Sequence, residues 1–330
     1  MLDFVLVSVI KVIVVFAVLM LMVAYSTWLE RRVLGRLQVR CGPNRVGPFG
    51  LLQPIADGLK GFFKEDIIPA NVDKVLYVLA PVISIVPAIA IVAVIPFGDK
   101  IHLLGREIPL GIADINVALL YVLGLAGLGE FGVMLGGWSS NNKYGLLGAL
   151  RTSAQMISYE LAMGLTLISV IMVSGSLSLR TIVENQAANG WNLWHQPIAF
   201  ILYLICGLAE INRTPFDMPE AESELACGFN IEYSSMKFAM FFMAEYAHMI
   251  ALAGITTCLF LGGWHGPFGL GSSVAWFLVK VVALVFFFIW ERGTFPRLRY
   301  DQVMRLGWKF MMPVALLNLL ATGVFYTVMA

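Results

Sequence analysis

A short acidic stretch is the most chemically suggestive part of this 330-residue sequence. The loop at residues 213–234 and the three residues before it carry six carboxylates, which are Glu210, Asp217, Glu220, Glu222, Glu224 and Glu232. Carboxyl groups that are crowded or removed from water hold a proton near neutral pH, so such a cluster can take up and release protons. A solvated surface turn would explain these charges equally well. The stretch alone leaves both interpretations open.

The composition indicates where these residues lie. Hydrophobic residues make up 59% of the chain and charged residues 13%, and the mean hydropathy is +0.82. Such a chain belongs in a bilayer. We expect a single all-α, polytopic membrane domain over residues 1–330. Its eight transmembrane helices are predicted at about residues 3–29, 74–97, 114–138, 151–175, 195–212, 235–262, 274–291 and 307–328.

The distribution of Lys and Arg predicts the orientation of these helices. Seventeen of these cations lie in the odd-numbered connections between predicted spans and three in the even-numbered ones. The positive-inside rule then places the charged connections in the cytoplasm and both termini on the outer side. The first span precedes a cationic cluster and lacks a small-residue cleavage site, so we expect it to be retained.

The first cytoplasmic connection has two parts. A loop rich in Gly and Pro is followed by residues 51–65, where apolar and polar side chains separate onto two faces of a helix. This pattern predicts an amphipathic helix at the membrane surface. A plain interfacial anchor would suffice for such a helix, but the preceding loop bears five arginines, more than an anchor requires.

Ionisable residues inside the predicted spans are costly and therefore informative. They are Glu130, Glu160, Glu245, His248 and Lys280. A rise of 1.5 Å per residue puts the three glutamates and the lysine about 12–16 Å from the cytoplasmic ends of their spans. Any one carboxylate could be satisfied by an ion pair, with Lys280 for instance. A proton-transfer layer explains the whole set better.

Several other chemistries are disfavoured. The four cysteines and four histidines are scattered without metal-ligand spacing, so we expect neither a disulfide framework nor an iron–sulfur cluster in this chain. Gly127, Gly129 and Gly132 match a dinucleotide-binding pattern but lie within an apolar span, where close helix packing explains them. A phosphate-binding P-loop is absent, and the net charge of +1 gives no indication of nucleic acid binding.

Long motifs in the chain closely resemble the H subunit of NADH-quinone oxidoreductase, the respiratory complex I, and its mitochondrial counterpart, chain 1. They are LERRVLGRLQVRCGPNRVGPFGLLQPIADGLKGFFKED, GGWSSNNKYGLLGALR with SAQMISYE, EINRTPFDMPEAESELACGFNIEYSSMKF and RGTFPRLRYDQVMRLGWK. The similarity runs over nearly the whole chain. The resemblance implies a subunit of a proton-pumping enzyme complex in the bacterial cytoplasmic membrane, not catalytic by itself.

The resemblance also implies roles for residues and partners. The residues expected to form the quinone portal and tunnel are Glu30, Arg31, Arg36, Asp57, Lys60, Phe63, Arg292 and Arg299. Those expected to couple quinone chemistry to proton pumping are Glu130, Glu160, Glu210, Asp217, Glu220, Glu222, Glu224, Glu232 and Glu245. Ubiquinone or menaquinone is the implied substrate. Flavin and iron–sulfur clusters are implied in partner subunits of the peripheral arm, and small membrane-arm subunits are implied as neighbours.

Two other functions remain as alternatives. A self-sufficient cation/proton antiporter would use the membrane glutamates, but we find neither an inverted repeat nor paired broken spans. The equivalent subunit of a related membrane-bound hydrogenase would share part of the pattern, although the full set of motifs favours the quinone enzyme. A membrane anchor without chemistry would leave the glutamates unexplained.

Overall fold

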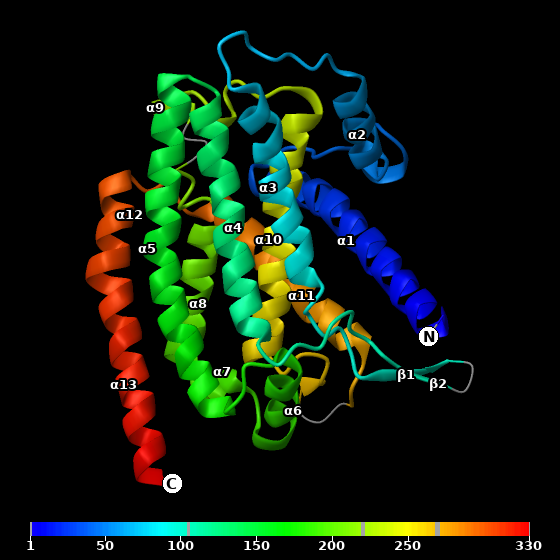
Figure 1. Ribbon diagram of the computed structural model, residues 1–330, viewed down its shortest axis with the longest axis vertical. Coiled ribbons are helices and arrows are strands. Elements are labelled where there is room, and N and C mark those ends of the chain that lie inside the picture. Colours follow the sequence, from blue (N-terminus) through cyan, green and yellow to red (C-terminus); the bar gives the residue numbers. More distant parts are fainter. Residues whose placement is uncertain (1, 104–105, 219–221, 268–270, 330) are drawn as a thin grey trace.

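The computed structural model describes residues 2–103, 106–218, 222–267 and 271–329, and these are mostly helical (Figure 1). The long helices are α1 (Leu2–Leu37), α3 (Lys74–Val92), α4 (Ala118–Ser139), α5 (Lys143–Ser174), α10 (Ser235–Phe260), α11 (Val274–Thr294) and α13 (Met312–Met329). The shorter helices are α2 (Gln53–Phe63), α6 (Leu179–Asn189), α7 (Asn192–His195), α8 (Pro197–Glu210), α9 (Glu222–Leu225) and α12 (Tyr300–Leu306), with single turns η1 (Pro48–Gly50) and η2 (Gly228–Asn230). A π-helical turn, η4 (Gly307–Met311), joins α12 to α13.

Seven helices in the described part of the chain are long and apolar enough to cross a membrane, which confirms the all-α membrane fold. The fifth predicted span corresponds to α8, which is apolar but has only 14 residues. At 1.5 Å per residue it is about 21 Å long, against a hydrocarbon core of about 30 Å. The predicted count of eight is therefore not reached on helix length alone.

Polar residues at the helix starts explain where two of the long helices begin. The Asp73 side chain accepts hydrogen bonds from the amides of Val75 and Leu76, and Asn142 caps α5 by accepting from the amide of Tyr144. Such caps satisfy amides that have no partner within the helix. They set the helix starts on the side that carries α2 and α9 (Figure 1).

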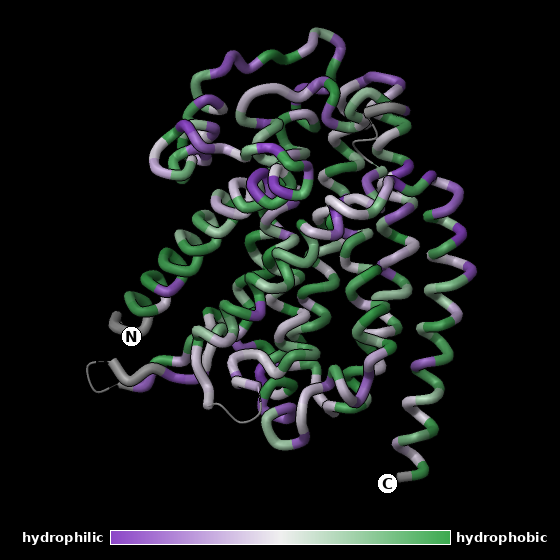
Figure 2. Tube along the Cα trace, turned by 180° about the vertical axis from the view of Figure 1, so that it is seen from behind, coloured by the Kyte–Doolittle hydropathy of each residue, from purple (hydrophilic) through white to green (hydrophobic). Residues whose placement is uncertain are grey.

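The bundle is built around α10, whose C-terminal half is almost fully buried, with α1 and α13 on opposite flanks (Figure 1). Figure 2 shows apolar residues along the helices and polar residues gathered in the connections at one end. Gly132 of α4 faces α3 so closely that a methyl group there would lie 2.6 Å from the Ser84 backbone nitrogen. Close helix packing therefore accounts for this glycine.

The other end of the bundle carries the small elements. Strands β1 (Lys100–Leu103) and β2 (Arg106–Pro109) form an antiparallel hairpin beside the α6–α7 region. Both chain ends lie towards this side, away from α2 and α9 (Figure 1). The Lys11 ammonium donates a hydrogen bond of 2.8 Å to the Pro109 carbonyl, which links the splayed half of α1 to the hairpin.

Candidate functional site

A cavity of about 510 Å³ lies between α1, α2 and α10. Its walls are largely apolar, with Met20, Val23, Ala24 and Thr27 from α1 and Met236, Phe238, Ala239, Phe242, Met243 and Tyr246 from α10. Three of the predicted portal residues line it, namely Arg31, Asp57 and Lys60. An apolar recess with a few polar groups at one end suits an amphiphilic small molecule.

Helix α2 is fixed as one wall of this cavity by bonds at both ends. Asp57 accepts a bond of 2.7 Å from Arg31 on α1 and one of 3.0 Å from Gln53. At the other end, the Ser235 hydroxyl lies 2.9 Å from the carbonyls of both Gly61 and Lys64. The helix therefore spans from α1 to the start of α10 and closes the recess between them.

Several apolar side chains of α2 are exposed at the surface of the isolated chain. Ile55, Leu59, Phe62 and Phe63 are all more than half exposed, and Phe63 reaches 86%. Phe63 thus points away from the cavity, although the neighbouring Phe62 lines it. These four apolar side chains of α2 are therefore uncovered in the isolated chain.

A buried charge cluster lies next to the cavity. Glu30 is 5% exposed and accepts hydrogen bonds from Arg292, from Arg213 at 3.3 Å and from the Tyr246 hydroxyl at 2.8 Å. Arg213 also lies 3.6 Å from Glu245. Burial opposes the charge on Arg213, but Tyr246, Glu30 and Glu245 raise the pKa of its guanidinium above the usual range. The cluster is therefore a fixed array of charges beside the N-terminal half of α10.

A second group of carboxyls lies deeper in the bundle. Glu130 on α4, Glu160 on α5 and Glu210 at the end of α8 are close enough for their charges to act on one another. Glu130 Oε1 and Glu210 Oε2 are buried without a hydrogen-bond partner among the described residues. Glu210 and His248 also line a cavity of about 30 Å³, enough for a water molecule. Such carboxyls can exchange protons through intervening water.

The described acids of the loop at residues 213–234 are paired with other elements and are not freely solvated. The pairs are Asp217 with Arg297 at 2.6 Å, Glu224 with Arg151 at 2.7 Å, and Glu232 with the Asn142 amide at 2.7 Å. Glu220 lies outside the described residues, and Glu222 begins α9 without a described side chain. The loop is therefore tied to α5 and to the segment that follows α11.

The structure separates the remaining predicted residues from the cavity. Glu30 and Arg292 belong to the buried cluster, while Arg36 is exposed beyond it. Arg299 is exposed and pairs with Asp301 at 2.6 Å. The predicted portal set therefore divides between the cavity rim, the buried cluster and the surface.

The prediction that Lys280 lies at the same depth as the membrane glutamates was wrong. Its position is about 9 Å from the start of α11 and about 21 Å from the end that bears Arg292, so it does not share the level of the glutamates. Its ammonium donates to three backbone carbonyls just beyond α10, those of Leu261 at 2.6 Å, Gly263 at 2.9 Å and His265 at 2.6 Å. A cation at this position interacts favourably with the unpaired carbonyls and the negative dipole end at the C-terminus of α10.

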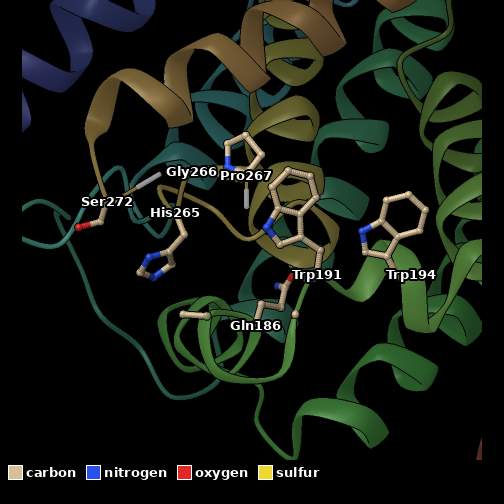
Figure 3. Close-up of a pocket in the computed structure, with 10 residues that line it drawn as sticks. Gln186, Trp191, Trp194, His265, Gly266, Pro267 and Ser272 are labelled. Carbon is tan, nitrogen blue, oxygen red and sulfur yellow. The ribbon is translucent and has the colours of Figure 1, made fainter. Parts of the chain in front are cut away.

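A second recess, of about 490 Å³, lies at the opposite end of the bundle and contains none of the predicted residues. Trp191, Trp194 and His265 surround it, with Gln186 on its floor (Figure 3). Both ends of the Gln186 side-chain amide bond the backbone. It donates to the Cys258 carbonyl at 2.7 Å and accepts from the Gly262 amide at 3.0 Å. Gln186 therefore closes the C-terminal end of α10.

Sequence reasoning missed the residues of α10 that line the main cavity. Met236, Ala239, Met243 and Tyr246 are spaced three and four apart, so they share one helix face. That spacing was visible in the sequence, but a lipid-facing or core-facing stripe has the same pattern. Only the position of α2 shows that this face borders a cavity.

Comparison with known proteins identifies the family. The pattern that defines the NADH dehydrogenase family matches residues 10–323. The chain belongs to this family. An H subunit of NADH-quinone oxidoreductase from Geobacter sulfurreducens is 58% identical over 325 residues, covering 95% of this chain and 93% of that protein. The H subunits of the same enzyme from Koribacter versatilis and Thermomicrobium roseum are 50% identical over 345 residues and 52% identical over 315 residues, and each covers more than nine-tenths of both chains.

Membership of the NADH dehydrogenase family confirms the resemblance carried by the sequence motifs. The relatives are named as subunits of an oxidoreductase complex, which agrees with the expectation that the chain works within an enzyme and is not catalytic by itself. With seven apolar helices of spanning length among the described residues, this member is a multi-pass membrane protein.

Proposed function

We propose that this chain forms the membrane side of the quinone path in NADH-quinone oxidoreductase and links quinone reduction to proton transfer. The cavity between α1, α2 and α10 is the observation that carries the proposal. Its apolar walls suit an isoprenoid tail, and Arg31, Asp57 and Lys60 supply polar contacts for a headgroup at its rim. Arginines near a reduced, anionic headgroup would stabilise its charge.

The proton-coupling part of the proposal rests on the two sets of carboxyl residues beyond the cavity, the buried charge cluster and the deeper glutamates. Tyr246 lines the cavity and also donates to Glu30 in the buried cluster. Glu245 of that cluster and Glu130, Glu160 and Glu210 then supply titratable groups further into the membrane. A change of charge in the cavity would alter the proton affinity of these carboxyls in turn. Electrons would reach the quinone from flavin and iron–sulfur clusters held by partner subunits.

The membrane arrangement follows from the same proposal. Both termini lie towards one end of the bundle, which fits an even number of membrane crossings and supports α8 as the eighth. With the cationic connections in the cytoplasm, the termini and the β-hairpin lie on the outer side. The exposed apolar face of α2 would rest at the cytoplasmic surface of the bilayer, or against a partner subunit.

A blocked cavity tests the quinone path. Ala239 lines the cavity, so an Ala239→Trp variant of the assembled complex should raise the KM for a long-tailed quinone about tenfold while NADH oxidation by ferricyanide is unchanged. Leu320→Trp is the matched control, because Leu320 is 58% exposed on α13, far from the cavity. An unchanged quinone KM in Ala239→Trp, with normal assembly, would refute the proposed path.

A further inference from the structure

Gln155 of α5 holds two ends of one connection together. It is fully buried, and its side-chain amide donates 2.8 Å hydrogen bonds to the carbonyls of both Ala209 and Phe216. The two amide hydrogens are thereby used on backbone groups that lie seven residues apart in the chain. A third contact, 3.4 Å to Asn212 Oδ1, lies between them. A single side chain thus fixes the turn from α8 into the acidic loop.

The two carbonyls adjoin residues of both proposed functional groups. Ala209 precedes Glu210 of the membrane carboxyls, and Phe216 precedes Asp217, which binds Arg297 at 2.6 Å. The same segment is held a second time, because the Leu298 amide donates to the Pro215 carbonyl at 3.0 Å. Arg297 and Leu298 follow α11, the helix that contributes Arg292 to the buried cluster. A displacement of this segment therefore reaches Glu210 through Gln155.

Gln155 is also connected to Glu160 through its own helix. The two residues are five apart, about 7.5 Å along the axis of α5. Between them, Tyr159 donates to the Val303 carbonyl at 3.0 Å, and its ring centre lies 5.4 Å from that of Phe216. Glu160 follows Tyr159 directly in α5, so a shift of this contact would move the helical turn that carries the Glu160 carboxyl.

We propose that Gln155 is a positioning residue that transmits movement of the Arg213–Asp217 segment to the carboxyls of Glu210 and Glu160. Its Oε1 atom is buried without a partner among the described residues, so the side chain is held only through its donor end. A shift of either carbonyl leaves a buried polar group unpaired, which is costly and favours concerted movement of both. This inference rests on the proposed function of the chain.

The test compares variants of the assembled complex in proteoliposomes, where quinone reduction and proton translocation are measured together. Gln155→Met keeps the length of the side chain and removes both donors. We expect the number of protons moved per NADH to fall about twofold or more, while uncoupled electron transfer to quinone continues. Ser153→Ala is the matched control, because the Ser153 hydroxyl bonds only to Ala149 of its own helix at 2.9 Å and should leave the ratio unchanged.

A second variant separates positioning from mere packing. Gln155→Glu can donate one bond only when its carboxyl is protonated. Its proton-to-NADH ratio should therefore recover partly as the pH is lowered from about 8 to about 6, relative to the wild-type ratio at each pH. A packing role would give no such recovery. If Gln155→Met fails to assemble, the pH profile of Gln155→Glu decides the question.

Three results would overturn the inference. They are a wild-type proton ratio in Gln155→Met, a pH-independent ratio in Gln155→Glu, and failure of both variants to assemble, since the last would assign Gln155 to folding. A wild-type complex that reduces quinone without moving protons would instead refute the proposed coupling function itself. The two failures are therefore distinguishable in one set of measurements.

Discussion

Removing the charge of Glu30 is the sharpest test of the buried cluster. Glu30 is 5% exposed and accepts from three donors, on Arg213, Arg292 and Tyr246. In Glu30→Gln the shape of the side chain is nearly kept. Arg292 and Arg213 both lose this counter-charge, although Arg213 keeps Glu245, and one acceptor atom becomes a donor that faces other donors. Removing one partner of a buried ion pair costs about 3–5 kcal/mol. We expect a loss of stability of that size.

Because a membrane complex inactivates irreversibly, the assay is the rate of thermal loss of quinone reductase activity. A change of about 3 kcal/mol corresponds to roughly a hundredfold change in an equilibrium constant, and the part that appears in the unfolding rate should exceed about tenfold. Lys100→Gln is the control, because Lys100 and its partner Glu107 are about half exposed and such pairs contribute little. Its inactivation rate should stay within about threefold of the wild type.

A double variant gives the result that would refute this reasoning. Replacing Arg292 as well, in Glu30→Gln/Arg292→Gln, removes one of the uncompensated cations. The double variant should therefore be more stable than the sum of the two single effects by about 1 kcal/mol or more. Strict additivity, or a Glu30→Gln variant as stable as the wild type, would show that the cluster is not the buried ion-pair network described here.

Three further predictions concern packing and the C-terminal end of α10. Lys280→Met should destabilise the complex by about 3 kcal/mol without changing the quinone KM, because it leaves three carbonyls without their donor; thermal inactivation and kinetics measure both. Gly132→Ala should cost about 1–3 kcal/mol in the same thermal assay through contact with Ser84, while Gly124→Ala, which meets open space, should not. Burial and the nearby Lys280 lower the pKa of His265, so stability should be lost as the pH falls below about 6.5, and less so in His265→Gln.

The helical scaffold could be predicted from the sequence because apolar length is a local property. Five of the long helices overlap predicted spans, namely α3, α4, α5, α10 and α11. The charged residues at their ends predict the orientation of the helices in the membrane. The uncertain case was α8, whose 14 residues are followed by the acidic loop. A short apolar helix crosses the bilayer only if neighbouring segments cover its ends. Such cover depends on tertiary packing, which the sequence of a single segment does not encode.

Pairing between distant residues is what the sequence could not provide. Lys280 looked like a partner for the glutamates because its depth was counted from one end of a span whose true end lies further on, at Thr294. Glu30 and Arg213 are separated by 183 positions, and nothing local indicates that they meet. Gln155 was missed for a related reason, since an uncharged amide in an apolar helix gives no chemical signal until its two carbonyl partners are known.

Tyr246 shows why the cavity and the carboxyls should be considered as one system. Its ring borders the cavity, its hydroxyl donates to Glu30, and the Arg213 guanidinium lies 4.4 Å from its ring centre. Arg213 itself is shared between Glu30 and Glu245. Under the proposed function, a negative charge formed in the cavity would therefore act on Glu30 and Glu245 together, through the tyrosine and the arginine that link them.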